Sequence, residues 1–495
     1  MIPSPYQKAV FDFVQTGAGS AIVGAVAGSG KTTTIVQAVK LIPKDQSVLM
    51  LAFNKSIAEE LNVRINLPNV EVKTFHSLGF AAYRSVHGAK VKMDNNKLFR
   101  LIDDLVNNSD LTPIEKAGLG YVSKIVKLGK SMGIGTPILE NTEENWWNLI
   151  EHHDVGGRDE GVDLGAILPI CQEILFRSNN MKYLIDFDDM IYSPVQQNLR
   201  FKKYDWVFVD EAQDCSATQR WILNALMKPS SRLIAVGDAC QAIYGFRGAD
   251  SSSLQMIGSE FNAVTLPLSI SYRCPKAVVT EAQKYVSHIE SSETAPEGSV
   301  SRLDKVSTEV FSPSDAILCR NVAPLVKFAY GLISRGTPVN MMGRDIGKGL
   351  ITLVKNMKAK DIVTLDEKLT EWSDNEINRL AGKQGNESKI ESITDKVDCI
   401  KIFISQATPG MTVQDLMKKI EAFFSDEPNG NVTLATCHRA KGLEFGKVFI
   451  LDEHRFFPKW AKLPWMIEQE KNLKYVAITR AKQDLVYISS GTWKD

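Results

Sequence analysis

Short apolar runs alternate with stretches of helical periodicity along much of the chain. Five runs in the first half have the length of strands, and a turn or a helical pattern follows each of them: 21–23, 48–52, 70–74, 205–209 and 232–238. Strands that alternate with helices in this way are typical of βαβ units, whose strands are parallel. The pattern therefore predicts an α/β fold with parallel sheets.

The strand pattern resumes later in the chain, at 316–320, 432–436, 447–451 and 485–488, with a helix expected over 469–482. Two longer stretches, 86–185 and 351–428, have helical patterns instead. We therefore expect two α/β domains, each interrupted by a mainly helical insertion. The first domain comprises 1–85 and 186–265, and the second comprises 266–350 and 429–495.

The first insertion contains a predicted helix over 114–132 with lysines near helical spacing: Lys116, Lys124, Lys127 and Lys130. A solvated helix face is the simpler explanation for such a set, and contact with DNA is the other. The sequence leaves both open.

The most informative motif is the glycine-rich turn between the strand at 21–23 and the helix that follows it. Residues 25–32 have the spacing of a P-loop, with Ala25 in place of the usual first glycine. Successive backbone N–H groups and a helix N-terminus bind an anion in such a turn. We therefore expect Lys31 to bind the β- and γ-phosphates of a nucleotide, and the Thr32 hydroxyl to ligate Mg²⁺.

Polar residues near other predicted strands extend this site. Asp210 ends a strand, where it can hold Mg²⁺, and Glu211 beside it can orient and deprotonate water. Gln7 precedes the P-loop strand, and its amide can both donate to and accept from an adenine edge. Taken alone, Gln7 is more simply a surface residue.

Two strand-to-helix turns, at Phe53–Asn54 and around His76, are expected at the same sheet edge as the P-loop. Amides, hydroxyls and an aromatic ring in such turns are suited to a nucleic-acid backbone or base. Taken alone, Asn54 is more simply a helix cap.

Composition narrows the class of protein. The chain has 495 residues, of which 44% are hydrophobic and 23% charged, which is ordinary for a globular protein. Lys+Arg and Asp+Glu number 58 each, so any nucleic-acid contact needs a local groove rather than a basic surface. The seven cysteines form no CxxC pair, which argues against a zinc site or disulfide framework. We expect no signal peptide and no membrane span, because no apolar run reaches about 18 residues.

The ordered set of motifs resembles superfamily 1 helicases of the UvrD/Rep type, and within them the helicase portion of the F-box DNA helicases. The matching segments cover nearly the whole chain: 6–7, 25–32, 52–55, 74–77, 210–214, 237–249, 272–273, 436–445 and 475–482. No segment resembles an F-box, and we expect none. The resemblance implies two RecA-like domains with ATP between them, and single-stranded DNA along which the protein moves 3′→5′.

The resemblance also implies roles for individual residues. The nucleotide would be bound by Gln7, Ala27, Gly28, Ser29, Gly30, Lys31, Thr32, Thr33, Tyr272 and Glu444, with Gln7 and Tyr272 at the adenine and Glu444 at the ribose. Mg²⁺ would be held by Thr32 and Asp210. Catalysis would involve Lys31, Glu211 as base, Gln241 as γ-phosphate sensor, and the arginine fingers Arg273 and Arg480. The DNA path would be lined by Phe53, Asn54, His76, Tyr244, Phe246, Arg247, Thr436 and His438.

The sequence departs from the UvrD/Rep pattern at three places. Thr33 stands where these proteins commonly carry an arginine near the adenine, so we expect looser base selectivity. Phe246 replaces the usual tryptophan and stacks with less area. The second insertion is much shorter than in the large bacterial members, so the regulatory role that it has there does not carry over. No nuclease motif follows the last strand.

Four functions compete: a DNA helicase, a translocase that strips proteins from single strands, a binding module with a degenerate site, and a P-loop kinase of a small molecule. The catalytic residues named above argue against a degenerate site, and a kinase does not explain the motifs at 74–77 and 479–481. The process expected for the helicase is DNA replication, recombination or repair. The expected partners are single-stranded DNA and single/double-strand junctions, with recombination or replication proteins. We expect a monomer without a membrane, in the cytoplasm (nucleoid or host cytoplasm) or, in a eukaryote, in the nucleus.

Overall fold

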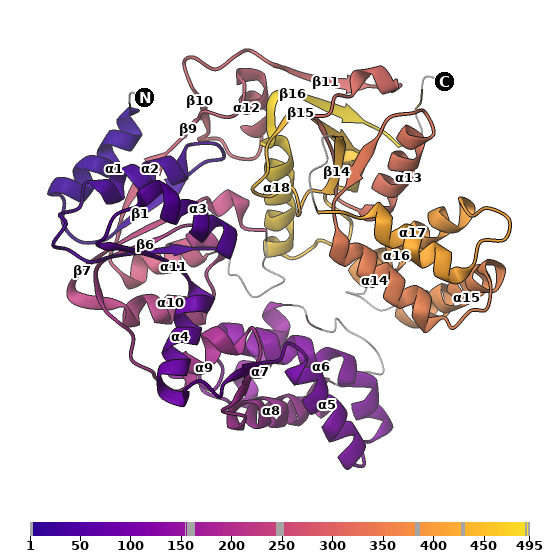
Figure 1. The fold of residues 1–495 in the computed structure, drawn as a ribbon, viewed down its shortest axis with the longest axis horizontal. Coiled ribbons are helices and arrows are strands. Elements are labelled where there is room, and N and C mark those ends of the chain that lie inside the picture. Colours follow the sequence, from indigo (N-terminus) through magenta and orange to yellow (C-terminus); the bar gives the residue numbers. More distant parts are fainter. Residues whose placement is uncertain are drawn as a thin grey trace. The chain divides into compact units, whose positions relative to one another are not determined.

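The computed structural model describes residues 3–153, 155, 164–243, 252–381, 387–426, 431–490 and 493. Its contacts divide the chain into two compact units, Met1–Ser269 and Ile270–Asp495 (Figure 1). Each unit contains a six-stranded parallel sheet, which confirms the predicted α/β fold class. Among the described residues, no helix combines the length and apolar character that crossing a membrane requires.

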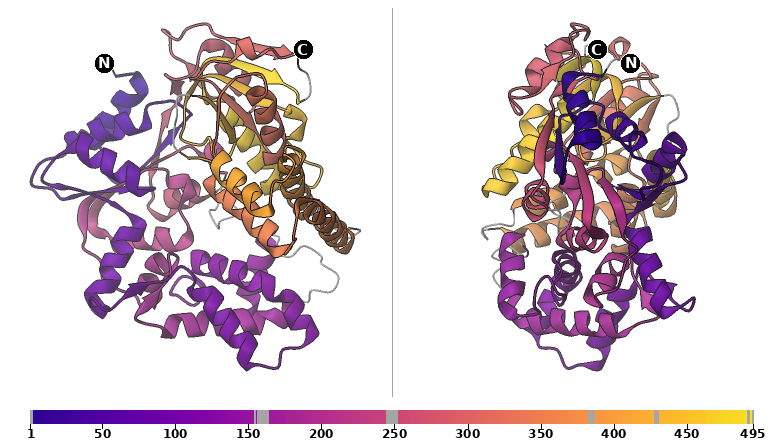
Figure 2. Two further views of the ribbon diagram at one scale, coloured as in Figure 1. Left: turned by 45° about the vertical axis from the view of Figure 1, so that its right-hand side comes forward. Right: turned by 90° about the vertical axis from the view of Figure 1, so that its left-hand side faces the viewer.

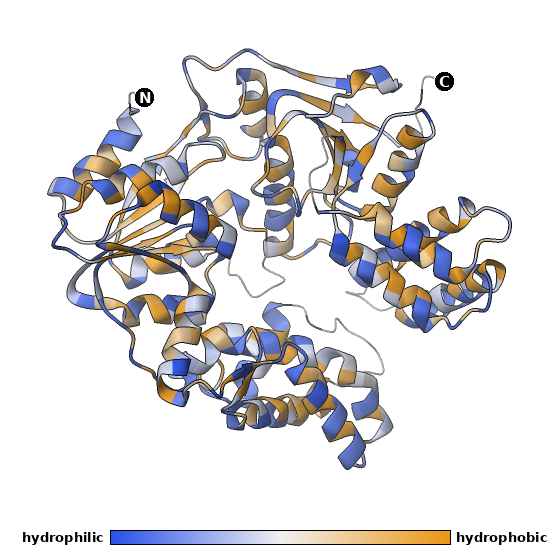
Figure 3. Ribbon diagram, viewed as in Figure 1, coloured by the Kyte–Doolittle hydropathy of each residue, from blue (hydrophilic) through white to orange (hydrophobic). Residues whose placement is uncertain are grey.

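The sheet of the first unit has the strand order β3-β2-β6-β7-β1-β8, and every neighbouring pair is parallel. Its strands are β1 (Ala21–Ala25), β2 (Val48–Ala52), β3 (Val70–Thr74), β6 (Tyr204–Val209), β7 (Met227–Gly237) and β8 (Val264–Leu268). All five strands that the apolar runs predict are therefore present. Figure 3 shows orange, hydrophobic stretches along the strands of this sheet.

Helices pack against both faces of this sheet (Figure 2). One face is covered by α1 (Pro5–Thr16), α2 (Lys31–Lys40) and α3 (Lys55–Ile65). The other face packs against α4 (Phe75–His87), α9 (Asp189–Gln196), α10 (Ala217–Ala225) and α11 (Ser253–Glu260). Because the strands are parallel, the turns that follow β1, β2, β3, β6 and β7 all lie at one edge of the sheet.

The first helical insertion has a hydrophobic core of its own, with Trp146 fully buried in it. Its elements are β4 (Lys92–Met93), α5 (Lys97–Asn108), α6 (Pro113–Met132), α7 (Glu143–His152), α8 (Leu164–Asn180) and β5 (Leu184–Ile185). Lys116, Lys124 and Lys127 are exposed on α6. Lys130 is not part of that solvated set, because it is buried in ion pairs with Asp186 at 3.0 Å and Asp189 at 2.7 Å.

The sheet of the second unit has the order β11-β16-β15-β12-β14-β13 and is also parallel. Its strands are β11 (Ser299–Leu303), β12 (Ala316–Cys319), β13 (Val339–Met341), β14 (Val432–Thr436), β15 (Phe445–Leu451) and β16 (Ala481–Ile488), and β9 (Ile270–Ser271) pairs separately with β10 (Glu290–Ser291). The helices of this α/β part are α12 (Lys276–Ala282), α13 (Val322–Ile333) and α18 (Pro464–Ile478). The helix expected over 469–482 is wrong at both ends, because α18 starts at Pro464 and the chain is already extended at Ala481.

The second insertion contributes α14 (Arg344–Asn356), α15 (Ile362–Leu380), α16 (Glu387–Ser405) and α17 (Val413–Phe423). Described residues of these helices share a hydrophobic core with the sheet. Leu369, Phe403 and Ile420 belong to the same buried cluster as Ile317 and Phe449 of the sheet. The division into four segments, with this insertion as a domain of its own, stays a prediction.

Candidate functional site

The turn between β1 and α2 has the backbone of an anion cradle. Gly28 and Gly30 have φ of 73° and 77°, a left-handed conformation that favours glycine. The N–H of Thr34 closes the first helical bond, to Gly30 O at 2.9 Å, so the three preceding amides lie ahead of the hydrogen-bonded ladder of α2. The buried Ser29 hydroxyl has no hydrogen-bond partner among the described residues. An oxyanion bound in the turn fits this unpaired hydroxyl and the amides.

Lys31 lies among three carboxylates of the first unit. Its Nζ is 3.0 Å from Glu211 Oε1. Burial disfavours the charged amine, but Glu211, Asp210 and Asp238 outweigh it and raise the pKa of Lys31. Burial, together with the neighbouring Glu211, raises the pKa of Asp210 to about 6. Lys31 is therefore held as a cation that can exchange a carboxylate for a phosphate.

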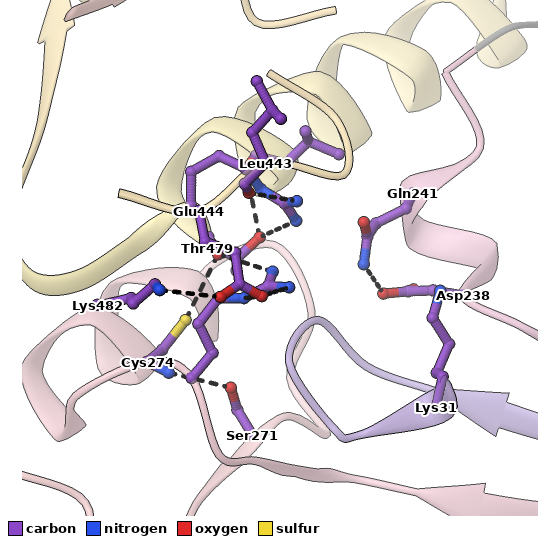
Figure 4. Close-up of polar contacts among 12 residues, drawn as sticks. Lys31, Asp238, Gln241, Ser271, Cys274, Leu443, Glu444, Thr479 and Lys482 are labelled. Atoms are coloured by element: carbon purple, nitrogen blue, oxygen red, sulfur yellow. Dashed lines mark hydrogen bonds and ion pairs between the residues drawn. The ribbon is translucent and has the colours of Figure 1, made fainter. Parts of the chain in front are cut away.

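Glu211 is oriented by a chain of buried amides. Its backbone has φ of 54°, an uncommon conformation for a residue with a side chain. Gln213 Nε2 donates to Glu211 Oε2 at 2.5 Å, and Gln213 Oε1 accepts the backbone N–H of Asp238 at 3.0 Å. Asp238 Oδ2 accepts from Gln241 Nε2 at 2.5 Å, as Figure 4 shows. The chain of contacts thus joins the expected base to the expected γ-phosphate sensor.

Gln213 and Asp238 lie inside the recognised motifs but were not predicted as site residues. Gln213 is fully buried, and a Cβ at Gly237 would lie 2.4 Å from its Oε1. Glycine at position 237 is therefore needed for Gln213 to reach Asp238. For Asp238 the available signal was a polar side chain directly after an apolar strand, and for Gln213 it was a position four residues beyond the end of β6.

Gln7 is buried, not a surface residue. It completes the cap of α1, because its Oε1 accepts from Ser4 N at 3.1 Å. Its Nε2 donates to Thr34 Oγ1 at 3.1 Å in the first turn of α2. An amide oxygen and nitrogen can each make one further hydrogen bond, so these contacts are compatible with the expected adenine contact.

The Mg²⁺ donors expected in this site are one hydroxyl and one carboxylate, Thr32 and Asp210. Within the described part of the chain, no group of three or more His, Cys, Asp or Glu has the arrangement of a metal site. Mg²⁺ beside a nucleotide commonly takes only one or two protein ligands and completes its shell with phosphates and water. The donor set at the P-loop fits that mode of binding.

The turns after β2 and β3 present aromatic rings at the same sheet edge. Phe53 is 45% exposed, while Asn54 caps α3 by accepting from Ile57 N at 2.9 Å. The His76 ring stacks on Phe187, with centroids 3.8 Å apart, and burial lowers the pKa of His76 to about 4. Phe187 is 53% exposed and was missed, because no periodicity links it to a residue 111 positions earlier. The predicted contacts Tyr244, Phe246 and Arg247 lie outside the described residues.

In the second unit, two residues predicted for the nucleotide site, Arg273 and Glu444, meet where β15 and β16 begin. Glu444 Oε1 accepts from Arg273 Nε at 2.8 Å, and Arg273 Nη1 donates to Thr479 O at 3.2 Å. Glu444 Oε2 lies 3.2 Å from Lys482 Nζ (Figure 4). Partial burial alone would raise the pKa of Glu444, but the two cations lower it. Tyr272, next to Arg273, is largely exposed.

Arg480 lies beyond the end of α18 and is 1% exposed. Its Nε donates to Val476 O at 2.9 Å and its Nη1 to Leu443 O at 3.2 Å. Arg480 therefore joins the last turn of the helix to the segment that carries Glu444.

The segment between β14 and β15 connects two groups of predicted residues. Thr436 ends β14, and its carbonyl accepts from the N–H groups of Arg439 and Ala440, both at 3.0 Å. Glu444 precedes β15, and both strands run parallel to β12. Residues 437–444 therefore cross from the carboxyl edge of the sheet, where Thr436 and His438 lie, to its amino edge.

Two family models match the chain: the UvrD/REP helicase N-terminal domain at residues 7–262 and the UvrD-like helicase C-terminal domain at 351–492. F-box DNA helicase 1 of Gallus gallus is 26% identical over 494 residues, covering 94% of this chain and 47% of that protein. ATP-dependent DNA helicase PcrA of Leuconostoc citreum is 22% identical, covering 95% and 80%. ATP-dependent DNA helicase Rep of Escherichia coli (strain K12) is 25% identical, covering 56% and 42%. The chain thus spans about half the length of the F-box helicase that it matches.

Proposed function

Because the chain belongs to the UvrD/REP helicase family, we propose that it is an ATP-dependent DNA helicase that moves 3′→5′ along single-stranded DNA. The main support for this proposal is that the expected nucleotide-binding and DNA-binding residues of the first unit lie at one edge of its sheet. The P-loop, the Lys31–Glu211 pair and the Gln213–Asp238–Gln241 contacts follow β1, β6 and β7. The exposed Phe53 follows β2, and His76, which stacks on Phe187, follows β3.

The proposed chemistry is hydrolysis of the γ-phosphate of ATP. Lys31 leaves Glu211 for the phosphates, which frees the Glu211 carboxylate to take a proton from the attacking water. Gln213 keeps that carboxylate oriented. Thr32 and Asp210 would hold Mg²⁺, which would neutralise charge on the phosphates when bound. Arg273 and Arg480 stabilise the negative charge that develops in the transition state.

We propose that residues 437–444 couple hydrolysis to movement on DNA. Arg480 and Glu444 hold one end of this segment, and Thr436 with His438 lies at the other. A change in the contacts of Arg273 or Arg480 therefore displaces the proposed DNA contacts through the eight residues of this segment. Stacking of bases on Phe53, Phe187 and His76 is tolerant of sequence, as a motor on DNA requires.

A translocase that strips bound proteins from single strands is the second candidate. It is favoured by the second insertion, whose described helices share the core of the sheet. Both candidates place the protein with chromosomal or viral DNA and with the proteins of replication, recombination or repair.

The proposal is tested with purified protein, ATP and short DNA substrates. ATP hydrolysis is expected to be slow alone and strongly stimulated by single-stranded DNA. Duplexes with a 3′ tail are expected to be unwound, and matched duplexes with a 5′ tail are not. Equal hydrolysis with and without DNA would overturn the proposal. Release of streptavidin from a biotinylated single strand, without unwinding of the tailed duplex, would select the stripping activity instead.

A further inference from the structure

Arg64 of α3 reaches across to the first turn of α2. Its Nη2 donates to Thr33 Oγ1 at 3.3 Å, and its Nη1 pairs with Glu60 at 2.9 Å on its own helix. About a third of the Arg64 side chain is exposed. The guanidinium is therefore anchored beside the P-loop and remains open to a ligand there.

The position of Thr33 relates Arg64 to one end of a bound nucleotide. In a P-loop, the lysine reaches the β- and γ-phosphates and the following hydroxyl reaches their metal ion. Thr33 comes next, and its N–H is the last of the amides that precede the helical bond from Thr34 N to Gly30 O. The α-phosphate and the nucleoside thus lie on the Thr33 side of the site. On the next residue, Thr34 contacts Gln7, the expected adenine contact.

We propose that Arg64 is a specificity-determining residue that packs its guanidinium plane against the base of the bound nucleoside triphosphate. This inference rests on the proposed function of the P-loop as an ATP site. A guanidinium stacks on an aromatic plane and also carries charge, whereas a lysine ammonium supplies only the charge. Arg64 is on a different helix from Thr33, so the base has a cation beside it even though Thr33 is uncharged. This proposal therefore predicts stronger base selectivity than Thr33 alone implies.

The test compares Arg64→Ala and Arg64→Lys with the unchanged protein. Nucleotide affinity is measured by equilibrium binding of ATP, GTP, CTP and UTP without DNA, and KM and kcat are measured with DNA. Nucleotide binding without DNA separates this inference from the proposed function. Hydrolysis that does not depend on DNA would overturn the proposed function, whereas the role of Arg64 in nucleotide binding would still be decided by the measured affinities. Arg177→Ala is the matched control, because Arg177 is exposed to the same extent and pairs with Glu173 at 2.6 Å four residues away.

Loss of a stacked cation at an exposed site is expected to raise the Kd and KM for ATP roughly two- to fivefold, with kcat unchanged. The loss should be larger for purine than for pyrimidine nucleotides, and Arg64→Lys should not restore it. An equal loss for all four nucleotides that lysine restores would overturn the inference in favour of an α-phosphate contact. Affinities in Arg64→Ala equal to those in Arg177→Ala would overturn it outright.

Discussion

Replacing Gln213 by Glu tests whether Glu211 is the base and whether Gln213 orients it. The change keeps the volume and the oxygen that accepts from Asp238 N. It replaces the amide donor, 2.5 Å from Glu211 Oε2, by a second carboxylate. Two carboxylates in one buried site share a proton, so the pKa of the pair rises.

The expected size of this effect follows from the geometry. At about 4 Å and an effective dielectric constant of about 20, like charges repel by about 4 kcal/mol, which corresponds to about three pKa units. Lys31, 3.0 Å from the other oxygen of Glu211, offsets part of the repulsion. We therefore expect the acidic limb of kcat to move upward by at least about one pH unit.

The assay is DNA-stimulated ATP hydrolysis between pH 5.5 and about 9, with thermal unfolding as a check on folding. A base with a raised pKa is protonated over a wider acidic range, so the variant should lose most activity at low pH and recover toward high pH. Gln219→Glu is the control, because this substitution adds the same charge at the cap of α10, outside the site. An acidic limb that coincides with that of the control would refute the assignment of Glu211 as base.

Two further predictions concern the first unit. Glu211→Gln should retain binding of ATP and single-stranded DNA but lose turnover, because the amide keeps the shape and removes the base; single-turnover hydrolysis at the unchanged rate would contradict it. Lys130→Met should lower the free energy of unfolding by about 3–5 kcal/mol, because it leaves Asp186 and Asp189 buried with one cation fewer. Both variants are measured by denaturant unfolding. The control Lys127→Met, on the exposed side of α6, should change stability by less than about 0.5 kcal/mol. Equal effects of Lys130→Met and Lys127→Met would show that the buried ion pairs contribute nothing to stability.

The elements of the fold were largely predictable because burial leaves a direct mark on the sequence. A strand such as β2 is buried along its whole length and reads as a continuous apolar run. The turns at the sheet edge were predictable for the same reason, since each polar residue there interrupts such a run. The P-loop adds the conformational demand for glycine at Gly28 and Gly30.

What the sequence did not reveal depends on partners that are distant along the chain. Lys130 has the spacing of a surface lysine, and only the approach of Asp186 and Asp189 makes it a core residue. Gln213 and Arg64 likewise contact Asp238 and Thr33, on other elements. Periodicity reports which face of an element is buried but does not identify the side chain that meets it from another element.

Neither the end of the helix before Arg480 nor the partners of its guanidinium were predicted from the sequence. The helix was expected to include it, but α18 ends at Ile478, and the buried guanidinium donates to Val476 O, Leu443 O and Thr479 Oγ1. Arg480→Ala would leave buried acceptors unpaired at about 1–3 kcal/mol each, so a loss of activity in that variant alone would not separate folding from catalysis. Arg480→Lys keeps a buried cation but lacks the fork that binds phosphate oxygens. If Arg480 acts as an arginine finger, the lysine variant should bind ATP and DNA and unfold near the unchanged temperature, while turnover falls by a factor of about 10³ or more. If Arg480 only closes the end of α18 against Leu443, the lysine variant should hydrolyse ATP at close to the unchanged rate with DNA present, and that result would disprove the finger.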